Sequence, residues 1–160
     1  MKKIKVPLAT YLLAERPDVL ASYGIGSCVV VVLYDPLLKL AAMAHVMLPG
    51  RGNEVRDHHT AKYSDQAIEG MLEELAQRGY SRKRLFAKIA GGSRMFHFSA
   101  PTLDSFPGQR NVEAVMKKLA QEGIPLVAMD VGKNFGRSVE FDTETGKMTV
   151  RTIAEGIKEI

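Results

Sequence analysis

The stretch YGIGSCVVVVLYD, residues 23–35, decides the fold that this sequence predicts. Its apolar run is rich in β-branched residues and long enough for a buried strand. Gly24 and Gly26 precede that run and permit the positive φ angles and close backbone contacts of a tight turn. Cys28, the only cysteine among 160 residues, stands where the turn meets the strand. We therefore expect a thiol that is held rigidly and still reaches the surface.

A second strand-like segment, LAAMAHVMLP at residues 40–49, follows after a short turn and carries His45 among apolar neighbours. Consecutive strands joined by short turns pair antiparallel, so we expect Cys28 and His45 side by side. An adjacent imidazole draws a thiol toward thiolate and can later protonate a leaving amine. A thiol and an imidazole are the minimum set of side chains for nucleophilic thiol catalysis.

Such a pair also needs a group that orients the imidazole and donors that stabilise an oxyanion. Ser22, at the end of the preceding strand, is the candidate for orienting His45. The backbone N–H groups of Ser27 and Cys28 are the candidates for the oxyanion hole. The residue types alone leave another interpretation open, since a lone cysteine or histidine is more often part of a core. A redox role and an internal disulfide are disfavoured, because no second cysteine is present.

Apolar runs between turn signals predict further strands. These lie at residues 9–14, 18–23, 85–90, 126–131, 139–141 and 148–153. The turn at Arg16-Pro17-Asp18 predicts that the first two form a hairpin, and Asp142–Gly146 predicts the same for the last two.

Two amphipathic helices are predicted, one from Ser64 to the stop at Gly79 and one from near Asn111 to Gly123. Their apolar stripes must be buried, and a mainly antiparallel sheet is available to cover them. We therefore predict an α/β layered fold with two principal helices, and treat residues 1–160 as a single domain.

Composition limits the partners. The chain carries 22 Lys and Arg against 18 Asp and Glu, a net charge of +4, which suits an acidic partner surface or modest nucleic-acid affinity, although an ordinary solvated face is the preferred interpretation. The basic residues lack interleaved aromatic residues, so nucleic-acid binding is not expected. No apolar run approaches the roughly 20 residues of a membrane helix, and Pro7 interrupts the weak signal-like start. We expect a cytoplasmic protein without membrane insertion.

Two polar stretches invite other functions. Asp57-His58-His59 resembles a metal-ligand run, but adjacent histidines usually do not share one ion and no spaced carboxylate set accompanies them, so no metal is expected. The long loop at residues 91–110 contains Phe96, Phe98 and Phe106. Loops of this length are often functional, which favours a lid or docking surface, although burial of these rings in the core is equally open.

Several segments together resemble the CheD family of chemoreceptor glutamine deamidases. They are GIGSCVVV (24–31), YDP (34–36), AMAHVMLP (42–49), AKY (61–63), AKIAGG (87–92), RNVEAV (110–115), GRSV (136–139) and TGK (145–147). The resemblance implies a three-layer α/β sandwich with a papain-like thiol hydrolase site and no cofactor. It places the nucleophile on Cys28 and the base on His45. Ser22 falls where the family commonly has threonine, and residues 104–109 also depart from the family pattern.

The resemblance further implies that Cys28 attacks a receptor glutamine, that ammonia leaves, and that hydrolysis of a thioester yields glutamate. Some family members also hydrolyse glutamyl methyl esters. The implied partners are the helical cytoplasmic domain of methyl-accepting chemoreceptors and a CheC-type phosphatase. Phe96, Phe98 and Phe106 would form an apolar lip that grips such a helix. The alternative is a non-catalytic regulatory binding partner of the phosphatase.

Overall fold

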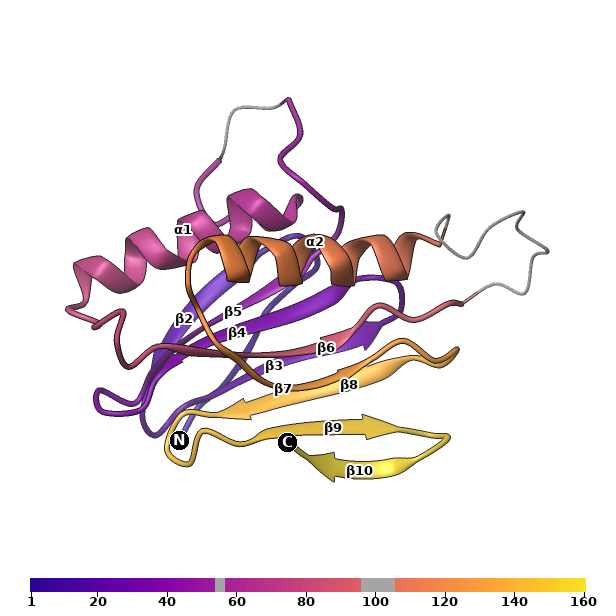
Figure 1. Cartoon of the computed structure of the whole chain (residues 1–160). Helices are drawn as coiled ribbons and strands as arrows, with labels where there is room; N and C mark the ends of the chain where they lie inside the picture. The colour runs from indigo at the N-terminus through magenta and orange to yellow at the C-terminus, as the bar shows by residue number, and fades with distance from the viewer. Residues whose placement is uncertain (54–56, 96–105) are drawn as a thin grey trace.

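The computed structural model describes residues 1–53, 57–95 and 106–160, which form two five-stranded sheets and two helices (Figure 1). The strands are β1 (Lys3–Lys5), β2 (Tyr11–Glu15), β3 (Val19–Ile25), β4 (Val29–Asp35), β5 (Leu40–Val46), β6 (Phe86–Gly91), β7 (Leu126–Val131), β8 (Arg137–Asp142), β9 (Met148–Thr152) and β10 (Gly156–Glu159). The helices are α1 (Ser64–Gln77) and α2 (Pro107–Gln121).

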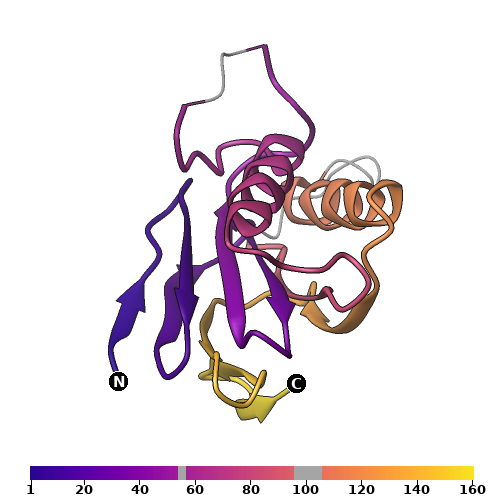
Figure 2. The same ribbon diagram turned by 90° about the vertical axis from the view of Figure 1, so that its left-hand side faces the viewer.

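The elements stack in layers. The central sheet has the strand order β2-β5-β4-β6-β7, and the outer sheet has the order β1-β3-β8-β9-β10. Both helices lie side by side over one face of the central sheet, and the outer sheet covers the other face (Figures 1 and 2). The central sheet is therefore buried from both sides, which explains why every residue of β4 and β5 is buried.

The β4 stretch supplies two cores at once. Val29, Val31 and Leu33 join the apolar cluster beneath the helices, whereas Val30 and Val32 join the cluster between the sheets. Successive side chains of a strand point to opposite faces, so an unbroken apolar run is what a strand with two buried faces requires. The predicted mixed α/β fold with two principal helices is confirmed.

The pairing of the early strands differs from the prediction. β4 and β5 pair antiparallel, as do β8 and β9, in agreement with the sequence analysis. The expected hairpin of residues 9–14 and 18–23 is wrong, because β2 pairs with β5 and β3 pairs with β1 and β8. The turn between β2 and β3 carries the chain from one sheet to the other. Local propensity indicates that a strand exists, but its partner is set by long-range packing.

Helix α2 begins earlier than the sequence analysis placed it. Pro107 stands in its first turn, where a missing N–H costs nothing, and Asn111 consequently lies within the helix and is 1% exposed. Both helices end as predicted, with Gly79 and Gly123 at positive φ angles just beyond them. Neither α1 nor α2 is long and apolar enough to span a membrane, and this holds for the described part of the chain.

Candidate functional site

The Cys28 thiol is carried by the turn that connects the two sheets. Gly24 adopts a φ of +65°, and the chain passes from β3 of the outer sheet to β4 of the central sheet within residues 25–29. Cys28 is half-buried and packs against the apolar cluster between the sheets. A Cβ on Gly91 would lie 2.3 Å from the Cys28 carbonyl oxygen, so only glycine lets β6 approach the turn this closely.

His45 lies on the neighbouring strand and on the same face of the central sheet. It pairs directly with Val30, and Cys28 stands two residues before Val30. Cys28 therefore stands one residue before the first pair of the β4–β5 ladder, Val29 with Val46, at the end of the sheet where His45 lies. The structure thus places Cys28 on the turn directly before β4 and His45 on β5, the strand that pairs with β4.

Ser22 reaches His45 from the other sheet. Its hydroxyl oxygen lies 2.8 Å from His45 Nδ1 and 2.9 Å from the carbonyl oxygen of Val6, and its side chain is fully buried. A carbonyl can only accept, so the single hydroxyl hydrogen of Ser22 is donated to Val6. Ser22 then accepts a hydrogen bond from Nδ1–H of His45. The neutral ring consequently carries its hydrogen on Nδ1 and keeps a free lone pair on Nε2.

Burial shifts the pKa of both candidate catalytic groups toward their neutral forms. Desolvation raises the pKa of the Cys28 thiol and lowers the pKa of the His45 imidazole. Without substrate and at neutral pH, Cys28 is therefore a protonated thiol and His45 a neutral imidazole. An imidazole in this state can act as a general base when substrate arrives. The expected shift of the thiol toward thiolate is therefore not found, because burial holds the pKa of Cys28 above its ordinary value.

The carbonyl groups of the turn are held by hydrogen bonds from two other elements. The amide of Ser93 donates to Gly26 O at 2.9 Å, and the amide of Gly92 donates to Cys28 O at 2.8 Å. Between them, Asn111 Nδ2 of α2 donates to Ser27 O at 2.9 Å. The sequence analysis used Asn111 only to place the start of a helix and missed this contact. A signal existed, because Asn111 lies four residues before the buried Val115 and so shares its helix face.

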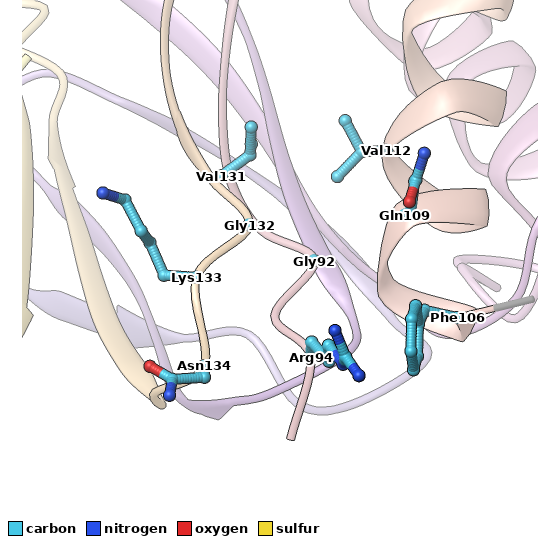
Figure 3. A pocket seen from close by; sticks show the side chains of 9 residues that line it. All are labelled: Gly92, Arg94, Phe106, Gln109, Val112, Val131, Gly132, Lys133 and Asn134. Atoms are coloured by element: carbon cyan, nitrogen blue, oxygen red, sulfur yellow. The ribbon is translucent and has the colours of Figure 1, made fainter. Parts of the chain in front are cut away.

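A cavity of about 520 Å³ lies next to this turn (Figure 3). Its lining consists of Gly92, Arg94, Phe106, Gln109, Val112, Val131, Gly132, Lys133 and Asn134. Phe106 stands directly before α2, and the Arg94 guanidinium lies 3.9 Å from the centroid of its ring. Cys28 is not part of this lining; the cavity is linked to the turn through Gly92, whose amide donates to Cys28 O. Phe96 and Phe98, the other two predicted docking residues, lie outside the described residues.

The candidate metal ligands lie elsewhere in the molecule. His58, His59 and Glu74 bring three potential ligand atoms within 4.8 Å of one another at the surface of α1. This cluster shares no residue with the Cys28, His45 and Ser22 group. Any metal there would be separate from the thiol.

The fold and the site define a mixed α/β protein in which a thiol on a turn stands near an imidazole of fixed tautomer. A thiol and an imidazole base are the groups that thiol-dependent acyl transfer uses. The family model described as "CheD chemotactic sensory transduction" matches residues 47–152. The chain therefore belongs to the CheD family. The matched range begins after Cys28 and His45, but full-length relatives extend over both.

The chain is similar over nearly its whole length to named proteins. It is 44% identical over 158 residues to chemoreceptor glutamine deamidase CheD of Halalkalibacterium halodurans, covering 98% of each chain. It is 44% identical over 164 residues to the protein of the same name from Thermotoga maritima, covering all of both chains. It is 41% identical over 160 residues to a probable chemoreceptor glutamine deamidase CheD of Caldanaerobacter subterraneus, covering 99% of this chain and 98% of the relative.

The raised pKa of Cys28 predicts how the thiol reacts with iodoacetamide. A thiol whose pKa lies above the ordinary value of 9.0 forms thiolate only at higher pH, so the alkylation rate should climb through pH 9 without a plateau between about pH 5 and 8. The same chain unfolded in urea serves as the control, and the pKa of its thiol should be lower, at the ordinary value for a cysteine. Mass spectrometry reports the reaction without ambiguity, because Cys28 is the only cysteine. A plateau at neutral pH would instead indicate a preformed thiolate–imidazolium pair.

Proposed function

We propose that this chain hydrolyses the side-chain amide of glutamine residues in chemoreceptors, leaving glutamate and releasing ammonia. The observation that carries the proposal is the buried hydrogen bond from His45 Nδ1–H to Ser22, which prepares Nε2 as a base on the strand next to Cys28. The names of the full-length relatives support the substrate. No cofactor is needed, since thiol, imidazole and water suffice for the chemistry.

The reaction begins with a proton transfer. Nε2 of His45 takes the proton of Cys28 as the sulfur attacks the amide carbon of glutamine. The backbone N–H groups of Ser27 and Cys28 stabilise the oxyanion that forms. Protonated His45 then gives its proton to the amide nitrogen, the C–N bond breaks, and ammonia leaves behind a thioester on Cys28.

The second half of the reaction uses the same groups. Nε2 of His45 takes a proton from water, and the resulting hydroxide attacks the thioester carbonyl. The C–S bond breaks, the proton returns to the sulfur, and the product is a glutamate side chain. Glutamyl methyl esters would follow the same route with methanol as the leaving group. In both halves Ser22 keeps the His45 hydrogen on Nδ1, which a serine hydroxyl can do as well as the threonine common in the family.

Substrate binding is proposed at the cavity that Phe106 lines. Apolar side chains of Phe106, Val112 and Val131 and the basic Arg94 and Lys133 line it, which suits a helix with both apolar and acidic residues. Phe96 and Phe98 remain part of this proposed lip. A CheC-type phosphatase is proposed as a second partner of the chain.

Loss of the thiol and loss of the orienting hydroxyl test the proposed chemistry. Cys28→Ala should abolish ammonia release from a receptor cytoplasmic fragment. Ser22→Ala should lower kcat by about tenfold or more, because the His45 hydrogen is no longer held on Nδ1, whereas Ser22→Thr should stay within about threefold of the wild type. An ammonia-coupled assay and mass spectrometry of the fragment report both steps. The regulatory alternative holds if the wild type releases no ammonia and if the wild type and Cys28→Ala stimulate a CheC-type phosphatase to the same extent.

A charge at Phe106 tests the proposed docking surface. Phe106→Asp should raise KM for the receptor fragment by about tenfold and leave kcat at saturation unchanged, because the contact lies outside the reacting groups. Aspartate suits the position before α2, so the helix should keep its stability. Leu37→Asp is the control, since Leu37 is 70% exposed on the turn that links the other end of β4 to β5. An unchanged KM would place the docking surface elsewhere.

A further inference from the structure

Asn111 connects helix α2 to the ends of both strands that carry the candidate catalytic pair. Its side chain is 1% exposed, and Nδ2 donates to Ser27 O at 2.9 Å and to Met47 O at 3.2 Å. Ser27 directly precedes Cys28, and Met47 directly follows the last residue of β5. Both acceptors are carbonyl groups, so the amide nitrogen must face them. One amide group therefore ties the thiol-bearing turn to the strand of His45.

The hydrogen bond to Ser27 O also fixes the direction of a neighbouring N–H group. Among the described residues, Arg16–Pro17 is the only cis peptide bond, so the bond between Ser27 and Cys28 is trans. In a trans peptide plane the carbonyl oxygen and the amide hydrogen point in opposite directions. Holding Ser27 O toward α2 consequently turns the Cys28 N–H away from α2. The hydrogen bond from Ser93 N–H to Gly26 O fixes the direction of the Ser27 N–H in the same way, because these two groups share a peptide plane.

From this geometry we infer that Asn111 is a positioning residue, which aims the Cys28 N–H at the oxyanion. The inference rests on the proposed deamidation and deepens it. Asn111 Oδ1 is buried and has no hydrogen-bond partner within the described residues, which costs free energy. The side-chain nitrogen of Asn111 thus makes two hydrogen bonds while its oxygen makes none, which fits a residue whose role is to donate. Asn111 touches no reacting atom in this account and acts through the peptide plane.

Substitution of Asn111 should separate two reactions of the same thiol. Asn111→Ala and Asn111→Asp remove the donors, so kcat for deamidation should fall by about tenfold to a hundredfold with KM within about twofold. Alkylation of Cys28 by iodoacetamide forms no oxyanion, so its rate should stay within about twofold of the wild type. Gln121→Leu, an exposed change near the far end of α2, is the matched control and should alter neither rate.

The outcomes distinguish this inference from the proposed function. Full kcat in both Asn111 variants, with an active wild type and an inactive Cys28→Ala, would overturn the role of Asn111 alone. Parallel loss of kcat and alkylation, together with a lowered melting temperature, would show a structural role and also overturn it. A wild type that releases no ammonia would instead contradict the proposed function itself.

A second, independent observation concerns the surface of α1. His59 Nε2 lies 2.8 Å from Glu74 Oε1, His58 Nε2 lies 3.5 Å from the same oxygen, and the two imidazole rings stack with centroids 3.7 Å apart. Asp57 lines the same hollow as His58 and Glu74. Two imidazole nitrogens and a carboxylate oxygen thus converge, with a second carboxylate nearby. The sequence analysis found no spaced carboxylate set beside these histidines, because Glu74 reaches them only through the fold, from helix α1.

We propose that His58, His59 and Glu74 bind a divalent transition-metal ion of the zinc type. Imidazole and carboxylate are ligands that zinc accepts in tetrahedral sites, where donor atoms lie about 3.4 Å apart. The separation of His58 Nε2 from Glu74 Oε1 is close to that value, all three ligand atoms lie within 4.8 Å of one another, and the side chain of His58 is 76% exposed and can adjust without repacking a core. A bound metal ion would link His58 and His59, which precede the β-bridge residue Thr60, to Glu74 of helix α1.

Zinc ion alone is the probe, and the Cys28→Ser chain is the background, since it removes a competing thiol. Competition with a chromophoric chelator should give one zinc per chain, and zinc should raise the melting temperature of the chain. His58→Ala, His59→Ala and Glu74→Gln should each weaken zinc binding by about tenfold or more, while the neighbouring Glu73→Gln should stay within about threefold. Zinc binding that these three substitutions leave unchanged, or no binding by the Cys28→Ser chain, would overturn the site.

Discussion

The candidate site depends on one hydrogen bond that crosses between the two sheets. His45 belongs to the central sheet and Ser22 to the outer sheet, and their side chains meet in the buried layer between them. The bond fixes the imidazole tautomer only while the two sheets keep their packing. Because Ser22 is also bound to the Val6 carbonyl, its own hydrogen has no freedom to reverse the arrangement. The chemistry of the imidazole is thus set by the packing of the whole sandwich.

The thiol is positioned by the same architecture from other directions. β3 delivers the turn, β4 carries the chain away from Cys28, and β6 and α2 hold the carbonyl groups of Gly26, Ser27 and Cys28. The residues directly after β6 thus contribute two hydrogen bonds to the turn and α2 contributes one. Burial makes both the thiol and the imidazole neutral in the free chain, so the reactivity proposed for Cys28 arises from a positioned base and positioned N–H donors.

Much of the fold could be predicted where a residue pattern has a local cause. The unbroken apolar run of β4 requires two buried faces, and the stripes of α1 and α2 require a sheet beneath them. The pairing of β4 with β5 followed from a short turn. β1 and β10 were missed because they are short edge strands with mostly exposed residues and no apolar alternation. The partner of β2 was wrong because a turn signal does not say whether the chain stays in one sheet.

The sequence by itself determined that Cys28 stands on a glycine turn before a buried strand and that His45 lies on the next strand, because short-range patterning and a tight turn are enough to pair neighbouring strands. Only the tertiary structure decided that Ser22 reaches His45 from a different sheet, that Asn111 holds the turn from a helix, and that Glu74 joins His58 and His59. Those contacts join residues 15 to 84 positions apart. Their geometry follows from how the layers pack, and no local pattern in the chain encodes it.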